Sequence, residues 1–233
     1  MTPSVSDPLS SIYTFSVQCR LPIKIVQTSP QDSPAKNMNK YQISEYAANH
    51  NLVEVKLNLG CGGRPLKGWI NIDNFDYEKN DSSRSGSLYD LKMDIRELAC
   101  ANESVDEILL VHVLEHFVRW ETVKMIAHYF TKLKPGGLLI VEMPDLDKCI
   151  EWYLNGKKAP HMNTPIGPRN MGHTQFHGNQ WDELDYETHR YVWTTAEFVD
   201  ALKDLGFEIT HSSWDAKFHQ KGRDMFVIAR KPC

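Results

Sequence analysis

The stretch from Val55 to Phe75, VKLNLGCGGRPLKGWINIDNF, restricts the fold more than any other part of the chain. A short run of alternating apolar residues, 56–59, ends at a cluster of glycines, 60–63, and a second such run, 69–72, ends at Asp73. Glycine at a strand end permits a positive φ and lets a ligand approach the backbone. A carboxylate at the tip of the next strand can accept hydrogen bonds from the hydroxyls of a ribose. The pattern therefore predicts two buried strands and a site for an adenosine-type ligand.

The spacing within this stretch argues against a dinucleotide. The fingerprint G-x-G-x-x-G ends in a glycine, where this chain has Pro65. Asp73 also follows the glycines much sooner than the roughly 20 residues typical of that fingerprint. Little room is left for a long helix whose N-terminus would bind a pyrophosphate. A nucleoside without phosphates, such as S-adenosylmethionine, therefore fits the spacing better than NAD.

Length and charge restrict the remaining choices. A chain of 233 residues is long enough for one substantial domain, with or without a small attachment. It carries 26 basic and 30 acidic residues, a net charge of −4 and a pI of about 6.2. These totals lack the positive charge of bulk nucleic-acid binders, although a local basic patch is compatible with them.

The cysteines and the apolar runs of the sequence indicate in which cellular compartment the protein is found. The five cysteines are scattered and form no C-x-x-C pair: Cys19, Cys61, Cys100, Cys149 and Cys233. Free thiols in a reducing compartment are the simplest interpretation. No apolar run approaches the ~20 residues needed to cross a bilayer, and no segment resembles a secretory signal. We therefore expect a soluble, cytoplasmic protein without a membrane partner.

The first 37 residues are rich in serine and proline and lack a sustained pattern. We expect residues 1–37 to form a loosely ordered extension. A transit peptide is disfavoured because Arg20 is the only arginine among them. Translation from Met38 is an alternative that would make the segment dispensable. Residues 38–233 are expected to form a single domain.

Apolar periodicity predicts the elements of that domain. The expected helices cover residues 39–49, 114–134, 146–154 and 195–205, and the expected strands cover residues 56–59, 69–72, 88–95, 105–113, 138–143, 207–211 and 224–230. Thr194 and Glu197 have the spacing of a capping box at the start of the last helix. Pro135-Gly136-Gly137 is expected to end the long helix, and the last two strands are expected to pair antiparallel.

Strands that alternate with helices predict an open α/β sheet, mostly parallel, with helices on both faces. Ligands of such sheets bind beyond the carboxyl ends of the strands, where the strand order reverses. Four features fall at predicted carboxyl ends: the turn 60–62, Asp73, Asp94 and His112. Their agreement is the main argument from the residues for a ligand site.

Several phrases together resemble the class I S-adenosylmethionine-dependent methyltransferases. They are LNLGCG (57–62), INID (70–73), DIREL followed by VDEILLVHVLEHF, and LKPGGLLIVEMPDL (133–146). The resemblance covers residues 55–146 and, more weakly, 194–230. It implies a Rossmann-like fold, S-adenosyl-L-methionine as cofactor and methyl transfer as the activity. The short span before G-W-I-N-I-D, where the family usually has a full helix, is similar to a subgroup of predicted methyltransferases with poorly defined substrates.

The resemblance also implies which residues hold the cofactor: Asn58, Leu59, Gly60, Cys61, Gly62, Asp73, Asp94 and Ile95. The glycine turn would pass beneath the methionine part. Asp73 would hold the ribose hydroxyls, and Asp94 would accept from the adenine amino group. Ile95 would stack on the ring and offer its backbone N–H. Residues 111–116 would form the floor between cofactor and acceptor.

Methyl transfer from a sulfonium is an in-line displacement, in which alignment contributes up to ~7–11 kcal/mol. A general base is needed only if the acceptor keeps its proton, and typically adds roughly 10²–10⁴-fold. His112 and His116 are the candidates, because an imidazole with a pKa of about 6.5 accepts a proton at neutral pH. The alternatives are that His112 packs against the cofactor and that His116 satisfies a buried contact. Asp145 either faces the acceptor or forms a turn.

Residues 147–193 interrupt the alternation of strands and helices and are rich in His, Trp and Pro. Long loops of this kind are often functional, so we expect a lid-like insertion that carries acceptor specificity; a poorly ordered insertion is the alternative. His173 and His177 could share a helical face, but glycines flank them and no H-E-x-x-H pattern is present. We therefore predict no metal.

The acceptor is restricted by what the chain lacks. No phrase resembles the D-P-P-Y type sequence of amino-methylating DNA enzymes, and residues 112–115 occupy its place. Together with the acidic pI, this disfavours nucleic acid and favours a small-molecule or sugar-containing acceptor. Two alternatives remain open: a non-catalytic nucleoside-binding module of the same fold, and an NAD-dependent oxidoreductase.

Overall fold

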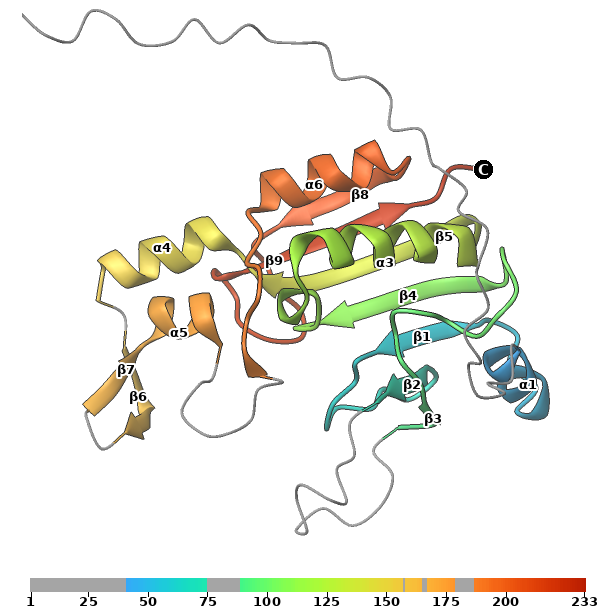
Figure 1. Ribbon diagram of the computed structural model, residues 1–233, viewed down its shortest axis with the longest axis horizontal. Coiled ribbons are helices and arrows are strands. Elements are labelled where there is room, and N and C mark those ends of the chain that lie inside the picture. Colours follow the sequence, from blue (N-terminus) through green and yellow to red (C-terminus); the bar gives the residue numbers. More distant parts are fainter. Residues whose placement is uncertain (1–40, 75–88, 157, 165–166, 179–186) are drawn as a thin grey trace, which may run out of the picture. The chain divides into compact units, whose positions relative to one another are not determined.

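One mixed sheet of seven strands organises the part of the chain that the computed structural model describes, residues 41–74, 89–156, 158–164, 167–178 and 187–233 (Figure 1). The strands are β1 Lys56–Leu59, β2 Ile70–Asp73, β3 Leu91–Lys92, β4 Val105–Val111, β5 Leu133–Pro144, β8 Glu208–Ser213 and β9 Asp224–Arg230. Their order is β3-β2-β1-β4-β5-β9-β8. Strands β1 to β5 pair in parallel, and β9 lies antiparallel between β5 and β8. The predicted α/β sheet with an antiparallel closing pair is confirmed.

The strand order reverses at β1. From β1 the chain continues to β2 and β3 on one side and then returns to β4 on the other. Leu59, at the end of β1, lies opposite Ile72 of β2 and Leu110 of β4. Open α/β sheets form their ligand crevice beyond the carboxyl ends at this point. The glycine turn that follows Leu59 therefore lies where a ligand is expected.

The central strands are buried on both faces. Leu57 and Leu59 of β1 and Ile108, Leu109 and Leu110 of β4 are each 0% exposed. Successive side chains of a strand point to opposite faces, so three buried residues in a row require cover on both sides, as is usual for a parallel sheet. Each such side chain contributes about 1.5–3 kcal/mol on burial. The sheet therefore gives the loops at its edge a rigid support.

The described helices are α1 Gln42–Asn49, the 3₁₀ helix η1 Leu114–His116, α3 Arg119–Lys132, α4 Leu146–Leu154, α5 Met171–His177 and α6 Thr195–Asp204. In Figure 1, α3 and α6 lie along β5, β9 and β8. The predicted cap of α6 is confirmed, because the side chain of Thr194 accepts a hydrogen bond of 3.1 Å from the backbone N–H of Glu197. No described helix is long and apolar enough to span a lipid bilayer.

The helix predicted over residues 114–134 is interrupted, so this prediction was wrong in its first turn. Phe117 and Val118 are extended, with ψ of 150° and 153°, and separate η1 from α3. The backbone carbonyl of Glu115 accepts hydrogen bonds from the N–H groups of residues 190–191. Since that acceptor is engaged by a distant segment, it does not continue the helix.

Two strands differ from the prediction by more than two residues in length. The strand expected at residues 88–95 pairs only over β3, and residue 88 lies outside the described residues. Strand β5 is longer than the expected 138–143, because Leu133 already pairs with Val105 of β4. Between the pairs Val105–Leu133 and Glu107–Leu138 the register shifts, because the four β5 residues 134–137, which include Pro-Gly-Gly, lie opposite a single residue of β4.

The insertion at residues 147–193 contains a hairpin that we did not predict. Strands β6 Lys158–Thr164 and β7 Gly167–Asn170 pair antiparallel, and α5 packs against α4. Figure 1 places these elements beyond the carboxyl ends of β4 and β5. The insertion thus lies beside the ligand edge of the sheet, and its role as a lid stays a prediction. The N-terminal extension expected at residues 1–37 lies outside the described residues.

Candidate active site

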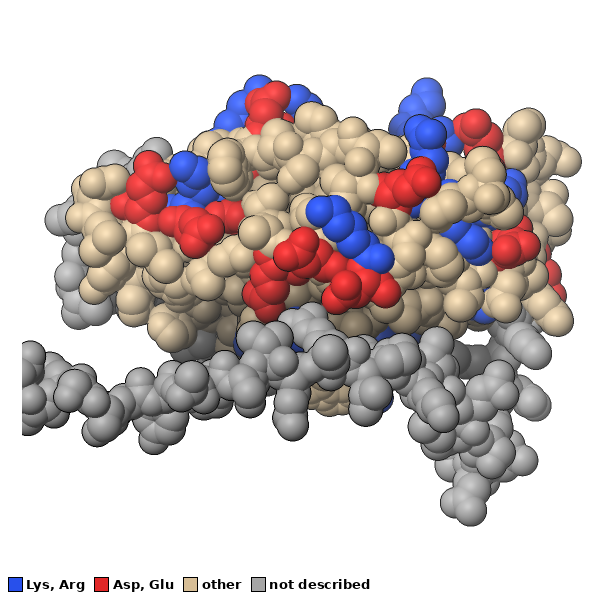
Figure 2. Space-filling view, turned by 90° about the horizontal axis from the view of Figure 1, so that it is seen from above, with Lys and Arg blue, Asp and Glu red and all other residues tan. Residues whose placement is uncertain are grey.

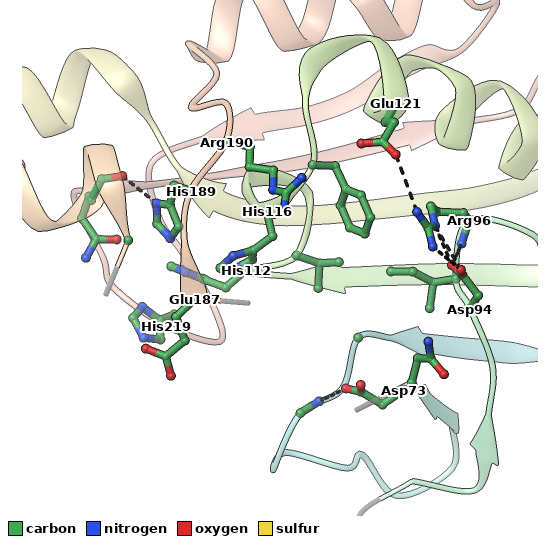
Figure 3. Close-up of a pocket in the computed structure, with 18 of the residues that line it drawn as sticks. Asp73, Asp94, Arg96, His112, His116, Glu121, Glu187, His189, Arg190 and His219 are labelled. Atoms are coloured by element: carbon green, nitrogen blue, oxygen red, sulfur yellow. Dashed lines mark hydrogen bonds and ion pairs between the residues drawn. The ribbon is translucent and has the colours of Figure 1, made fainter. Parts of the chain in front are cut away.

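A cavity of about 820 Å³ opens beyond the carboxyl ends of β1, β2 and β4. Segments that follow these strands line one side of it, and residues of α5 and of the segment 187–190 line another. Figure 3 shows His112, His116 and His189 close together, at the other end of the cavity from Asp94. Among the predicted site residues, the cavity is lined by Gly60, Gly62, Asp73, Asp94, Ile95, His112 and His116.

The glycine turn approaches Val113, just beyond the end of β4, too closely for a side chain at Gly60. Gly60 and Gly62 have φ of 64° and 55°, a region that favours glycine. A Cβ atom at Gly60 would lie 2.7 Å from Cγ2 of Val113. The backbone N–H groups of Gly60 and Cys61 both donate to the carbonyl of Ile72, at 2.8 and 3.3 Å. The turn is therefore fixed between its two neighbouring strands, with its backbone facing the cavity.

Asp73 ends β2 and joins the glycine turn through its side chain. Its Oδ2 accepts a hydrogen bond of 2.8 Å from the backbone N–H of Gly62. Asp73 and Gly62 both line the cavity. The carboxylate of Asp73 therefore lies at the tip of β2, next to the glycine turn. A residue that binds the ribose hydroxyls is expected to lie there.

Asp94 lines the cavity beside Ile95, but it also forms an ion pair that the sequence did not predict. Nε of Arg96 lies 3.0 Å from both carboxylate oxygens of Asp94, and its Nη1 lies 3.7 Å from Glu121 (Figure 3). The hydrogen bonds from Arg96 lower the pKa of Asp94. Asp94 is therefore a carboxylate of fixed orientation, which can only accept hydrogen bonds.

Three of the predicted cofactor residues do not line this cavity. Leu59 is fully buried in the sheet. Nδ2 of Asn58 donates to Oδ1 of Asn71 at 2.9 Å and to the carbonyl of Arg64 at 3.3 Å, so it braces the loop between β1 and β2. Cys61 lines an adjoining cavity of about 440 Å³ that shares Gly60, Gly62, His112 and His219 with the first.

His112 lies between two carboxylates. Its Nδ1 is 3.1 Å from Oε1 of Glu115, and its Nε2 is 2.9 Å from Oδ2 of Asp224. Burial lowers the pKa of His112, but the two carboxylates outweigh it and raise the pKa to about 9. His112 is also one of three described residues other than glycine with a positive φ, 54°, a strained conformation that is common at functional sites. At neutral pH both ring nitrogens therefore carry protons, and neither accepts one.

His116 and His189 form a second pair of histidines. Nδ1 of His116 is 3.2 Å from the carbonyl of Thr188, and Nδ1 of His189 is 2.7 Å from the carbonyl of Gln175. A carbonyl only accepts, so each Nδ1 carries the hydrogen and each Nε2 of a neutral ring has a free lone pair. The rings meet edge to face, with centroids 5.0 Å apart. Burial lowers the pKa of His189, which is therefore neutral at pH 7.

Glu115 is fully buried beneath these histidines. Burial raises its pKa, but the neighbouring His112, His116 and His189 outweigh it and lower the pKa to about 2. Neither carboxylate oxygen accepts a hydrogen bond of good geometry from any described residue. Asp145, by contrast, is buried and satisfied: it accepts from the backbone N–H groups of Lys148 at 3.0 Å and Thr195 at 2.8 Å. Asp145 thus has the turn-forming role.

The sequence did not identify several residues of the site. Arg96, His189 and Glu121 line the cavity, and Asp224 holds His112. His189 reaches His116 because the segment that follows it is bonded to the backbone carbonyl of Glu115, with Arg190 N at 2.7 Å. A contact between such distant segments cannot be predicted from a local sequence pattern.

Comparison with known proteins agrees with this geometry. A family model described as a methyltransferase domain matches residues 37–212. The match covers most of the chain, so the chain belongs to this methyltransferase family. No curated protein matches the sequence.

Solved structures show the same fold. A S-adenosylmethionine-dependent methyltransferase from Methanosarcina mazei aligns with a TM-score of 0.50 and 20% identity, over 80% of this chain and 98% of that one. A Burkholderia thailandensis 1,6-didemethyltoxoflavin-N1-methyltransferase, solved with 1,6-didemethyltoxoflavin and S-adenosylhomocysteine, aligns with a TM-score of 0.50 and 14% identity, over 84% of this chain and 79% of that one. The predicted class I methyltransferase, its Rossmann-like fold and its cofactor S-adenosylmethionine are confirmed.

Proposed function

We propose that this methyltransferase binds its cofactor with the glycine turn, Asp73, Asp94 and Ile95, and methylates a small-molecule or sugar-containing acceptor held at the histidine end of the cavity. One observation carries the proposal: residues from the carboxyl ends of several neighbouring strands line a single cavity of about 820 Å³. Sites for small organic ligands typically measure about 300–1,000 Å³.

The residues at the end of the cavity near Asp94 fit the cofactor. Gly60 and Gly62 both line the cavity, and their positive φ forms a turn whose backbone a ligand can approach without a Cβ atom in the way. Asp73 offers a carboxylate for two ribose hydroxyls, and Asp94, oriented by Arg96, offers one for an amino group. Asn58 and Leu59 support the turn from the sheet, whereas Cys61, within the turn, lines the adjoining cavity. When bound, S-adenosylmethionine supplies an electrophilic methyl group on a sulfonium.

The other end of the cavity fits the acceptor. His116, Thr174, Gln175 and His189 line it with polar atoms, which suits a ligand with hydroxyl or amino groups. Nε2 of His116 can hold a proton from such a group, since its Nδ1 is committed to Thr188. His112 is better suited to positioning, because both of its nitrogens face carboxylates. A small-molecule acceptor agrees with the ligand named for the Burkholderia protein.

Surface charge supports a partner other than nucleic acid. On the face seen in Figure 2, basic and acidic side chains are interspersed. Nucleic-acid binding requires a concentrated basic surface. Cys61, Cys100, Cys149 and Cys233 form no disulfide, which is compatible with a cytoplasmic location, and we propose that location on this ground.

Ligand binding and turnover test the proposal separately. S-adenosylmethionine and S-adenosylhomocysteine should each stabilise the full chain against heat, by about 2.7 kcal/mol at 100 times Kd, and NAD should not. Incubation with a panel of hydroxylated and amino-containing metabolites and sugars should then release S-adenosylhomocysteine. Stabilisation by NAD alone would contradict the cofactor site. Binding without turnover on any acceptor would favour a non-catalytic module.

A further inference from the structure

Glu115, His116 and His189 form a compact cluster of potential metal ligands at the acceptor end of the cavity. One ligand atom of each residue lies within 4.8 Å of the others. Glu115 and His116 belong to η1, and His189 lies on the distant segment that is bonded to the backbone of Glu115. The same hydrogen bonds that interrupt the predicted helix therefore assemble the cluster.

The carboxylate of Glu115 has one charged neighbour, His112, and uses only part of its capacity for partners. It is 0% exposed, and neither oxygen accepts a hydrogen bond of good geometry from the described residues. Nδ1 of His112 faces Oε1 at 3.1 Å, and Oε2 has no such neighbour among the ion pairs of the described residues. Buried charges in proteins are usually paired or coordinate metals. Glu115 thus has coordination capacity that the described side chains do not use.

Both histidines have the hydrogen bonds typical of metal ligands. Each directs Nδ1 to a backbone carbonyl, His116 to Thr188 and His189 to Gln175. A metal-binding histidine usually donates its other ring N–H in this way, which fixes the tautomer and aims the free nitrogen. In Figure 3, His116 and His189 lie side by side next to the cavity. Two Nε2 lone pairs and one carboxylate are therefore available together.

A second cluster, His112, His219 and Asp224, has similar distances but already contains a cation. Nη2 of Arg223 is 2.7 Å from Oδ2 of Asp224 and 3.1 Å from Nδ1 of His219. The guanidinium thus occupies the position and neutralises the charge that a metal would need. Of the two clusters, the one around Glu115 is therefore the better candidate for a metal site.

We propose that Glu115, His116 and His189 bind a divalent transition-metal ion through one carboxylate oxygen and two imidazole Nε2 atoms. Two histidines and one carboxylate suit Zn²⁺, Fe²⁺, Mn²⁺ and Co²⁺ and leave coordination positions open. Metal–ligand bonds of about 2.0–2.2 Å place tetrahedral donors about 3.3 Å apart, so the three side chains would move slightly closer on binding. The prediction of no metal considered only His173 and His177 and did not foresee this contact.

His116 and His189 line the cavity, so an acceptor hydroxyl, amine or carboxylate in the cavity could reach the open coordination positions of a bound ion. This role of the metal rests on the proposed function, whereas metal binding itself does not. A bound ion would orient the acceptor and make its proton easier to lose. With its Nε2 on the metal, His116 would not accept that proton, so the ion would replace the base role given to His116 in the metal-free site. Metal binding would also explain why a carboxylate, Glu115, is buried beside the acceptor end of the cavity.

Metal binding is tested on the full chain after removal of metals with a chelator. Titration with Co²⁺ should give one equivalent bound and a visible absorption band, and Zn²⁺ should displace it. Glu115→Gln and His189→Gln should each weaken binding by about 100-fold or more, since even residues behind the ligands cost 10–100-fold. His173→Gln, in α5 and outside the cluster, and His219→Gln, in the cluster that Arg223 occupies, should leave binding unchanged.

S-adenosylhomocysteine binding serves as the folding control for each variant. His189→Gln that binds this ligand normally but not Co²⁺ would support the metal site. Equal Co²⁺ affinity in the parent chain and in both cluster variants, or loss only in His219→Gln, would overturn it. If the parent chain binds Co²⁺ but not S-adenosylhomocysteine, the proposed function fails and the metal site stands. Folding of each variant is then checked by its melting temperature and not by S-adenosylhomocysteine binding.

Discussion

The carboxylate of Asp73 accepts a hydrogen bond of 2.8 Å from the backbone N–H of Gly62. This bond joins the tip of β2 to the turn that follows β1, so two adjacent strands present one surface to the cavity. The glycine turn and the acid are therefore one unit, and a change in either should alter the cofactor site.

Replacement of Asp73 with alanine should weaken the binding of S-adenosylhomocysteine by about 10–100-fold or more, because hydrogen bonds to a charged group contribute roughly 1.5–3 kcal/mol. Asp73→Asn should have an intermediate effect, since the amide keeps one acceptor oxygen. Isothermal titration calorimetry measures both affinities. Asp215→Ala is the control, because Asp215 is exposed and pairs with Lys217 and Lys221. An unchanged affinity in Asp73→Ala would refute the ribose assignment.

Gly60→Ala should destabilise the protein by about 2–5 kcal/mol. The left-handed conformation costs an alanine about 1–2 kcal/mol, and the contact of 2.7 Å with Val113 adds an overpacking term of about 1–3 kcal/mol. Gly68→Ala is the matched control: its φ is 85°, yet no atom lies within 4 Å of the new Cβ. Only the first of these costs applies there. Urea unfolding should separate the two variants, and equal losses would show that the approach to Val113 is unimportant.

Asp145→Ala should destabilise the protein by about 2–4 kcal/mol and leave cofactor affinity unchanged. The buried carboxylate holds the N-terminus of α4 through Lys148 and that of α6 through Thr195. Its loss removes one helix cap, at about 1 kcal/mol, and leaves buried N–H groups unsatisfied, at about 1–3 kcal/mol. Thermal unfolding and calorimetry measure the two effects. A large loss of acceptor turnover at normal stability would instead favour the alternative that Asp145 faces the acceptor.

The parts of the fold that the sequence predicted correctly depend on neighbouring residues. β1, β2 and β4 follow from short apolar runs, and the start of α6 follows from Thr194 and Glu197, three residues apart. The hairpin β6–β7 has no such signal, because KAPHMNT and GPRN contain prolines and no apolar alternation. Local chemistry therefore predicted the sheet and not the insertion.

The same limit applies to the site. Asp73 and the glycine turn lie at strand ends that the sequence reveals directly. The neighbours that set the chemistry of His112 and His116 are distant in the sequence: Asp224 lies on β9, and His189 lies near the end of the insertion. Sequence reasoning treated both histidines as equivalent bases. The structure distinguishes them, because carboxylates hold His112 at both ring nitrogens.

Cys61 should react with iodoacetamide very slowly, although it lines a cavity next to the cofactor site. Burial, with a contribution from Asp73, raises the pKa of its thiol to about 12, and only the thiolate is a nucleophile. At pH 8 a thiol with this pKa is ionised to about 10⁻⁴, against about a quarter for a thiol of pKa ~8.5. Alkylation of Cys61 should therefore rise about tenfold per pH unit up to pH 10, where an ordinary thiol has already levelled off. Mass spectrometry of the peptides gives each rate, with the exposed Cys233 as the internal reference. A rate at Cys61 that levels off near pH 9, or that equals the rate at Cys233, would contradict a thiol kept neutral by the turn around it.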